Sequence, residues 1–181
     1  MWIEQAAKEL GAKTKWLPFE LHADTPNEGA PKPFTDEQWP AIRERLISIA
    51  AKVGLPMNPP RRNVNSRLAL ETGELVRLQF GDDQMAAFHH AVSRAFFVDG
   101  ADIGALPVIV ELAKPFGLTR EAVAWPWSQR QFASTIEDSM RASRRAGVTG
   151  VPAFGWPDAR ASSGMMEPEA IVAILRERMP K

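Results

Sequence analysis

The side chains that could act as nucleophiles, general bases or metal ligands form no catalytic constellation. The chain has no cysteine and three histidines, so it offers no thiolate for disulfide exchange or metal binding. His89 and His90 are adjacent, so only one can face the apolar stripe of a helix, and no carboxylate is spaced to complete a metal site. No histidine can be placed beside Ser162 or Ser163 to activate a hydroxyl. We therefore expect no catalytic residue and no metal site in the chain as written.

The stretch with the most specific local signals lies at residues 147–156. Gly147 predicts the end of a helix, and Thr149 and Gly150 predict a turn. Pro152 confines Val151 to extended backbone and, because a proline cannot donate to a sheet ladder, it belongs at the start of a strand or at an edge. A cis peptide bond before Pro152 is compatible with such a turn. On these residues alone, the pattern indicates a structural turn that leads into a strand.

Other polar and aromatic groups have common structural explanations. Two arginine pairs, at residues 61–62 and 144–145, could bind an anionic ligand, but paired arginines on loops and helix ends usually face solvent. We expect His22, which follows a strand, to be solvated. The cluster W-P-W at residues 125–127 is expected to pack between helices and a sheet rather than to bind peptides.

The elements that must position the turn follow from periodicity and capping. We expect a helix over residues 3–10, an edge strand over residues 15–21 with Pro18 inside it, and a loop to residue 34. A block of helices then begins at the T-x-x-Q pair Thr35 and Gln38. Asn65 is expected to cap one helix and Asp82 or Asp83 the next, and a further helix is expected over about residues 105–116. A Ser128–Gln131 capping box is expected to open a helix that runs to Gly147, and Pro168 is expected at the start of the last helix. An apolar stripe is expected at Met85, Phe88, His89, Val92 and Phe96. Residues 153–156 and 159–162 are expected to pair as a hairpin around Pro157 and Asp158.

Composition narrows the classes of partner. Of 181 residues, 45% are hydrophobic and 24% are charged, with 22 Lys plus Arg against 22 Asp plus Glu, which is ordinary for a globular protein. A balanced charge gives no electrostatic footprint for nucleic acid or for an anionic membrane. The N-terminal residues show no targeting pattern, and no apolar run is long enough to span a bilayer. We expect a cytoplasmic protein that binds neither nucleic acid nor membrane.

Several motifs resemble the DsbA-like branch of the thioredoxin superfamily. The run G-V-T-G-V-P-A-F at residues 147–154 is similar to that family's cis-proline loop. The runs W-L-P-F-E-L at 16–21 and D-T-P-N-E-G at 24–29 resemble its W-x-P-F-x-L strand and D-x-P-x-E-G loop. The runs at 65–70 and 96–104, N-S-R-L-A-L and F-F-V-D-G-A-D-I-G, resemble the helical insertion of FrnE-type members, and Ser163 with Gly164 fits the approach to the last helix. The resemblance spans nearly the whole chain.

This resemblance implies an α/β thioredoxin-like fold with a helical insertion, from which the first, central strand is missing. It divides the chain into a remnant of the first helix, edge strand and loop (1–34), the insertion (35–127), and the C-terminal half of the thioredoxin-like domain (128–181). The helix over residues 3–10 has no N-cap, so we expect the family's reactive motif and its strand to lie upstream. Each unpaired buried backbone group costs roughly 1 to 3 kcal/mol. We therefore expect a truncated reading of a longer gene, a helix-dominated remnant, or a homo-oligomer in which another subunit completes the sheet.

In function, the resemblance implies a thiol-disulfide oxidoreductase that is redox-inactive as written. Its substrate-binding residues would be Thr149, Gly150, Val151 and Pro152, where Val151 pairs with an extended peptide or a small thiol. No cofactor is implied. One alternative is a relative of the glutathione-dependent 2-hydroxychromene-2-carboxylate isomerases, which would bind glutathione along the same loop. The other alternative is a non-catalytic peptide-binding module.

Overall fold

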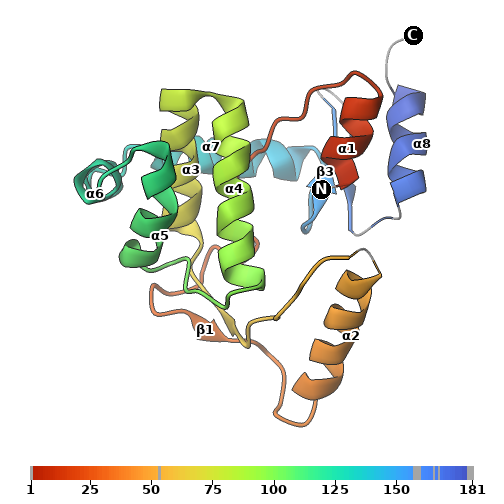
Figure 1. Ribbon diagram of the computed structural model, residues 1–181, viewed down its shortest axis with the longest axis horizontal. Coiled ribbons are helices and arrows are strands. Elements are labelled where there is room, and N and C mark those ends of the chain that lie inside the picture. Colours follow the sequence, from red (N-terminus) through yellow and green to blue (C-terminus); the bar gives the residue numbers. More distant parts are fainter. Residues whose placement is uncertain (1, 53, 157–159, 165, 167, 179–181) are drawn as a thin grey trace. The chain divides into compact units, whose positions relative to one another are not determined.

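The computed structural model describes residues 2–52, 54–156, 160–164, 166 and 168–178. It divides the chain into two compact units. We call Pro18–Asp138 the helical unit, and Met1–Leu17 together with Ser139–Lys181 the terminal unit. Figure 1 shows the helices of both units. Among the described residues, no helix is both long and apolar enough to cross a membrane.

The helical unit consists mainly of short helices, and its apolar core is formed by side chains between Leu68 and Phe132. Its elements are β1 (Ala30–Pro31), α2 (Trp39–Ala51), β2 (Arg62–Asn63), α3 (Arg67–Phe80), α4 (Asp82–Phe97), α5 (Leu106–Ala113), the 3-10 helix η1 (Lys114–Phe116) and α6 (Arg120–Ser128), and the unit boundary falls inside α7 (Ala133–Arg145). Helices α3 and α4 pack against each other, as Figure 1 shows. The expected stripe on α4 is confirmed for Met85, Phe88 and Val92, which are buried, whereas His89 and Phe96 are half-buried.

The pair β1–β2 is a short antiparallel ladder, with Ala30 opposite Asn63 and Pro31 opposite Arg62. Gly29, at φ +76°, precedes it, and a Cβ added there would lie 2.6 Å from the Asn63 carbonyl oxygen. No other residue type fits this close approach without a shift of the backbone. The segment expected to be a plain loop therefore contains a strand.

Two of the expected helix starts are confirmed in detail. The Thr35 amide donates to Gln38 Oε1 at 3.0 Å, and the Gln38 amide donates to Thr35 Oγ1 at 3.3 Å, which is a reciprocal capping box before α2. Asn65 Oδ1 accepts from the Arg67 amide at 2.9 Å at the start of α3. Short-range capping patterns specify these starts because both partners lie within three residues.

Two other expected starts are wrong. Asp82 and Asp83 lie inside the first turn of α4 rather than at its cap, and Asp82 instead pairs with Arg77 at 2.9 Å. Ser128 ends α6 rather than opening the next helix, and its hydroxyl donates to the Trp125 carbonyl at 2.8 Å. The competing cap is Thr119, which begins α6 by accepting from the Ala122 amide at 3.2 Å.

Acid is expected to weaken the starts of α2 and α6. The pKa of Glu37 is lowered by hydrogen bonds from the Thr35 hydroxyl and from the Glu37 backbone amide. The pKa of Glu121 is lowered by hydrogen bonds from the Glu121 backbone amide and from the Thr119 hydroxyl. A lowered carboxyl pKa means that the folded state binds fewer protons than the unfolded chain, so the stabilisation is present above the ordinary value of 4.5 and is lost as pH falls through the lowered pKa. Urea unfolding at pH 6 and pH 3 tests this prediction. The Glu37→Gln, Glu121→Gln double variant should lose less stability between the two pH values than the parent, whereas Glu44→Gln, on the exposed face of α2, should follow the parent.

The edge strand expected over residues 15–21 is not formed. Residues 13–20 have no helix or strand assignment, and 21–24 form a turn. A strand exists only where a neighbour completes its ladder, and the described sheets are the two-stranded pairs β1–β2 and β3–β4. Residues 15–21 therefore have a strand-like composition but belong to neither of these sheets.

The terminal unit contains α1 (Trp2–Glu9), β3 (Ala153–Phe154), β4 (Ser162–Ser163) and α8 (Pro168–Arg178). Ala6, Ile171 and Leu175 form its buried cluster, against which Phe154 and Trp156 pack. The expected hairpin is confirmed as an antiparallel pair with Ala153 opposite Ser163 and Phe154 opposite Ser162, so the register differs from the expected pairing. Its expected turn at Pro157 and Asp158 lies outside the described residues.

Candidate functional site

The four candidate residues Thr149, Gly150, Val151 and Pro152, which we call the proline loop, are contiguous on the terminal unit between α7 and β3. The end of α7 is fixed by the Val148 amide, which donates to the Ser143 carbonyl at 3.0 Å. The other end is fixed where the Gly164 amide donates to the Pro152 carbonyl at 2.9 Å. The Val151–Pro152 peptide bond is cis. The proline loop is thus held at both ends.

Between these anchors the proline loop faces open space. The Val151 side chain is 50% exposed, and a Cβ added at Gly150 would have no atom within 4 Å. In the part of the chain that the structure describes, the backbones of Thr149, Gly150 and Val151 make no hydrogen bond. Exposed backbone donors and acceptors of this kind can pair with an extended ligand.

Arg160 borders this loop. The Ala161 amide donates to the Ala146 carbonyl at 2.8 Å, which carries the segment before β4 alongside the end of α7. A Cβ added at Gly147 would lie 3.5 Å from Arg160 Nε. Sequence reasoning did not select Arg160, because its approach to Gly147 depends on this tertiary pairing.

The two arginine pairs weighed from the sequence have different environments. Arg144 and Arg145 are exposed in the last turn of α7. In the helical unit, Arg61 pairs with Asp36 and its guanidinium lies 5.8 Å from the centre of the Trp39 ring. Arg61 is therefore occupied by contacts within the chain.

The described residues contain no group of three or more His, Cys, Asp or Glu side chains that could hold a metal ion. His22 is exposed, and the rings of His89 and His90 lie 5.8 Å apart. The structure brings no acid, base and nucleophile together among the candidates considered from the sequence.

A buried ionic cluster in the helical unit was missed by sequence reasoning. Arg67 donates to Glu20 Oε2 and Glu71 Oε1, each at 2.7 Å, and to the Ala133 carbonyl at 3.0 Å. Burial acts to lower the pKa of Arg67, but its hydrogen bonds to Glu71 and Glu20 outweigh burial and raise the pKa. Glu20 and Ala133 are 47 and 66 residues from Arg67 in the chain, so only the spacing of Arg67 and Glu71 could have signalled this cluster.

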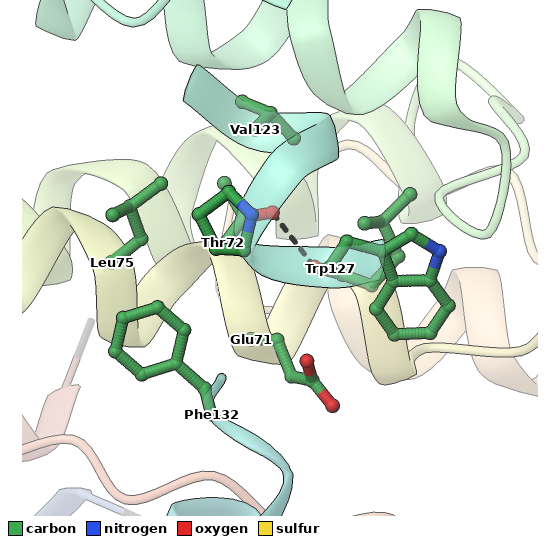
Figure 2. Close-up of a pocket in the computed structure, with 8 residues that line it drawn as sticks. Glu71, Thr72, Leu75, Val123, Trp127 and Phe132 are labelled. Atoms are coloured by element: carbon green, nitrogen blue, oxygen red, sulfur yellow. Dashed lines mark hydrogen bonds between the residues drawn. The ribbon is translucent and has the colours of Figure 1, made fainter. Parts of the chain in front are cut away.

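Glu71 also lines a small pocket between α3 and α6. Figure 2 shows the Glu71 carboxylate with the rings of Phe132 and Trp127 on either side of it. Glu71 Oε2 is buried and makes no hydrogen bond among the described residues. The volume open to a water centre is about 10 Å³, the least that one water molecule needs. This pocket is therefore too small for an organic substrate.

The aromatic run at residues 125–127 lies within α6 and does not pack as expected. Trp125 is 67% exposed, whereas Pro126 is buried and Trp127 is half-buried. Because these residues form a helical turn, neighbouring side chains point in different directions. The expected packing is wrong for Trp125.

Two solved structures have a similar fold. One is a proposed protein disulfide isomerase from Nitrosomonas europaea, with a TM-score of 0.72, 18% identity, and coverage of 97% of this chain and 87% of that chain. The other is a 2-hydroxychromene-2-carboxylate isomerase, with a TM-score of 0.71, 16% identity and the same coverage of 97% and 87%. No curated protein matches the sequence. At these identities the two structures show that the fold is shared, and in this chain the fold is rich in helices with few strands.

The family is shown by a match that covers nearly the whole sequence. The profile of the DSBA-like thioredoxin domain matches residues 2–176. The match includes the proline loop as well as the helices of the helical unit. The chain therefore belongs to the DsbA-like thioredoxin domain family.

Proposed function

We propose that this chain carries the substrate-binding loop of a FrnE-like thiol-disulfide oxidoreductase, and that the loop holds an extended peptide or a small thiol. The observation that carries the proposal is that, among the described residues, the backbones of Thr149, Gly150 and Val151 make no hydrogen bond. Thr149 and Val151 are exposed, Gly150 is half-buried, and the chain is anchored on both sides of them. An extended ligand would gain hydrogen bonds there without displacing a contact within the protein.

The chemistry limits what the chain does by itself. Thiol-disulfide exchange needs a thiolate that attacks one sulfur of a disulfide while the other sulfur leaves as a thiolate. The chain has no cysteine. Binding is therefore the proposed role of these 181 residues, and any thiol chemistry must use cysteines from outside them.

Self-association is a further part of the proposal. Residues 13–20 belong to no ladder and the described sheets have two strands each. A second copy that adds a strand would satisfy more of the exposed backbone. Sedimentation equilibrium tests this point, and a monomer across the micromolar range would contradict it.

The second candidate function is a glutathione-dependent isomerase. Its support is the fold likeness to the 2-hydroxychromene-2-carboxylate isomerase, which equals the likeness to the proposed disulfide isomerase in coverage. This candidate requires glutathione to be preferred over other extended peptides.

Both candidates are tested by titrating the ¹⁵N-labelled chain with glutathione and with an unstructured hexapeptide. We expect the amide signals of Thr149, Gly150 and Val151 to shift on binding, because their N–H groups gain acceptors. A hexapeptide N-methylated at every peptide nitrogen is the matched control, and it should bind more weakly because it has no backbone N–H to donate to the loop. Shifts confined to residues outside the proline loop would contradict the proposal, and binding of glutathione but not of the hexapeptide would favour the isomerase candidate.

A further inference from the structure

We infer that Arg160, supported by Arg144 and Arg145, makes the proline loop selective for extended ligands that carry a carboxylate close to the residue that pairs with Val151. The inference rests on the proposed function, since it names the class of ligand that the loop prefers. Glutathione and short acidic peptides share this chemistry.

The first step is the position of the Arg160 guanidinium. A Cβ added at Gly147 would lie 3.5 Å from Nε and 3.6 Å from an Nη atom of Arg160. Gly147 has a φ of +87°, a conformation that side chains rarely adopt, so the site keeps room for the guanidinium. The guanidinium therefore lies beside Gly147, two residues before the proline loop.

The second step is that these cations are unpaired. Within the part of the chain that the structure describes, Arg144, Arg145 and Arg160 make no ion pair or hydrogen bond through their side chains. All three residues are exposed. Their donors are free for a ligand, and a guanidinium can give two parallel hydrogen bonds to one carboxylate.

The third step is the charge of the surrounding sequence. Residues 141–164 contain four arginines and one acidic residue, Asp158, which lies outside the described residues. This concentration of positive charge occurs in a chain with zero net charge. Complementary charge of this kind attracts and orients anionic ligands.

The fourth step is reach. Gly147 and Val151 are four residues apart, so their Cα atoms are separated by at most about 14 Å. An extended tripeptide spans roughly 10 Å. A ligand that pairs with Val151 can therefore place a terminal carboxylate near Arg160 if its chain runs toward Gly147.

Arginines near a helix end also have a structural explanation, because cations stabilise the negative end of the helix dipole. That explanation accounts for Arg144 and Arg145, which belong to α7. It does not require Arg160, which comes from the segment before β4. If an arginine acted only on the helix dipole, its replacement would lower stability without changing ligand preference. Ligand preference is therefore the readout that separates the two explanations.

The test compares S-methylglutathione with its dimethyl ester, which has the same backbone but no carboxylate. Loop amide shifts give the Kd of each probe for the intact chain in low salt. We expect the ester to bind the parent at least tenfold more weakly. Arg160→Gln should weaken binding of the acid form roughly 3- to 10-fold and leave the ester unchanged, and Arg160→Lys should restore part of the loss because it keeps the charge.

Arg94→Gln is the control, because it removes one exposed guanidinium from the helical unit. It should leave both Kd values unchanged. Equal binding of acid and ester to the parent would overturn the inference and leave the proposed function standing. Failure of both probes and of the hexapeptide to shift any amide of the proline loop would overturn the proposed function, and this inference with it.

Discussion

Replacing Arg67 with methionine is expected to lower the free energy of unfolding by about 3 to 5 kcal/mol, the usual cost of breaking a buried ion pair from one side. The Arg67 side chain is 17% exposed, and its partners Glu20 and Glu71 are 8% and 5% exposed. Removing the guanidinium leaves two buried carboxylates without their cation. It also removes the hydrogen bond from Arg67 to the Ala133 carbonyl. Urea unfolding at pH 7, followed by circular dichroism at 222 nm, measures the loss.

Arg94→Met is the matched control for Arg67→Met. The Arg94 side chain is 67% exposed and lies 4.0 Å from Asp99, and an exposed pair of this kind contributes about 0 to 1 kcal/mol. Equal losses in the two variants would contradict the role assigned to the buried cluster. A triple variant, Arg67→Met with Glu20→Gln and Glu71→Gln, should recover part of the stability, since it removes the unpaired charges as well.

The parts of the fold that sequence predicted correctly depend on short-range patterns. The Thr35 and Gln38 capping box is satisfied by bonds that span three residues, and Gly117 ends its helix in the left-handed conformation. Such signals act through local backbone geometry, so tertiary packing does not alter them. The same reasoning failed at Ser128, where the earlier cap at Thr119 had already started a helix.

The parts that sequence did not predict depend on partners far away in the chain. Residues 15–21 have the composition of a strand, but a strand also needs a neighbour. In the Arg67 cluster, the Arg67 side chain donates to the Ala133 carbonyl, 66 residues away in the chain. The periodicity of a single sequence carries no information about such pairs. The proline loop was predicted to bind substrate only because its sequence resembles that of a known family. Its residues alone indicate a turn.

Truncating Leu175 in α8 is expected to destabilise the terminal unit by about 2 to 5 kcal/mol, the range for a buried Leu→Ala change. Leu175 is 6% exposed and packs with Ala6 and Ile171, and Phe154 belongs to the surrounding layer. The β3–β4 pair has two residues in each strand, and an isolated hairpin of this size is not stable in water. The strand that follows the proline loop therefore depends on the apolar cluster for its order.

Hydrogen exchange and ligand binding together measure this dependence. In Leu175→Ala the amides of residues 153–154 and 162–163 should exchange faster, and glutathione should bind the proline loop more weakly, because the ligand must also order the loop. Leu78→Ala is the matched control, since Leu78 is 68% exposed on α3 in the helical unit and its truncation should change neither readout. Unchanged exchange at residues 153–154 in Leu175→Ala would mean that the hairpin holds the proline loop without support from α8.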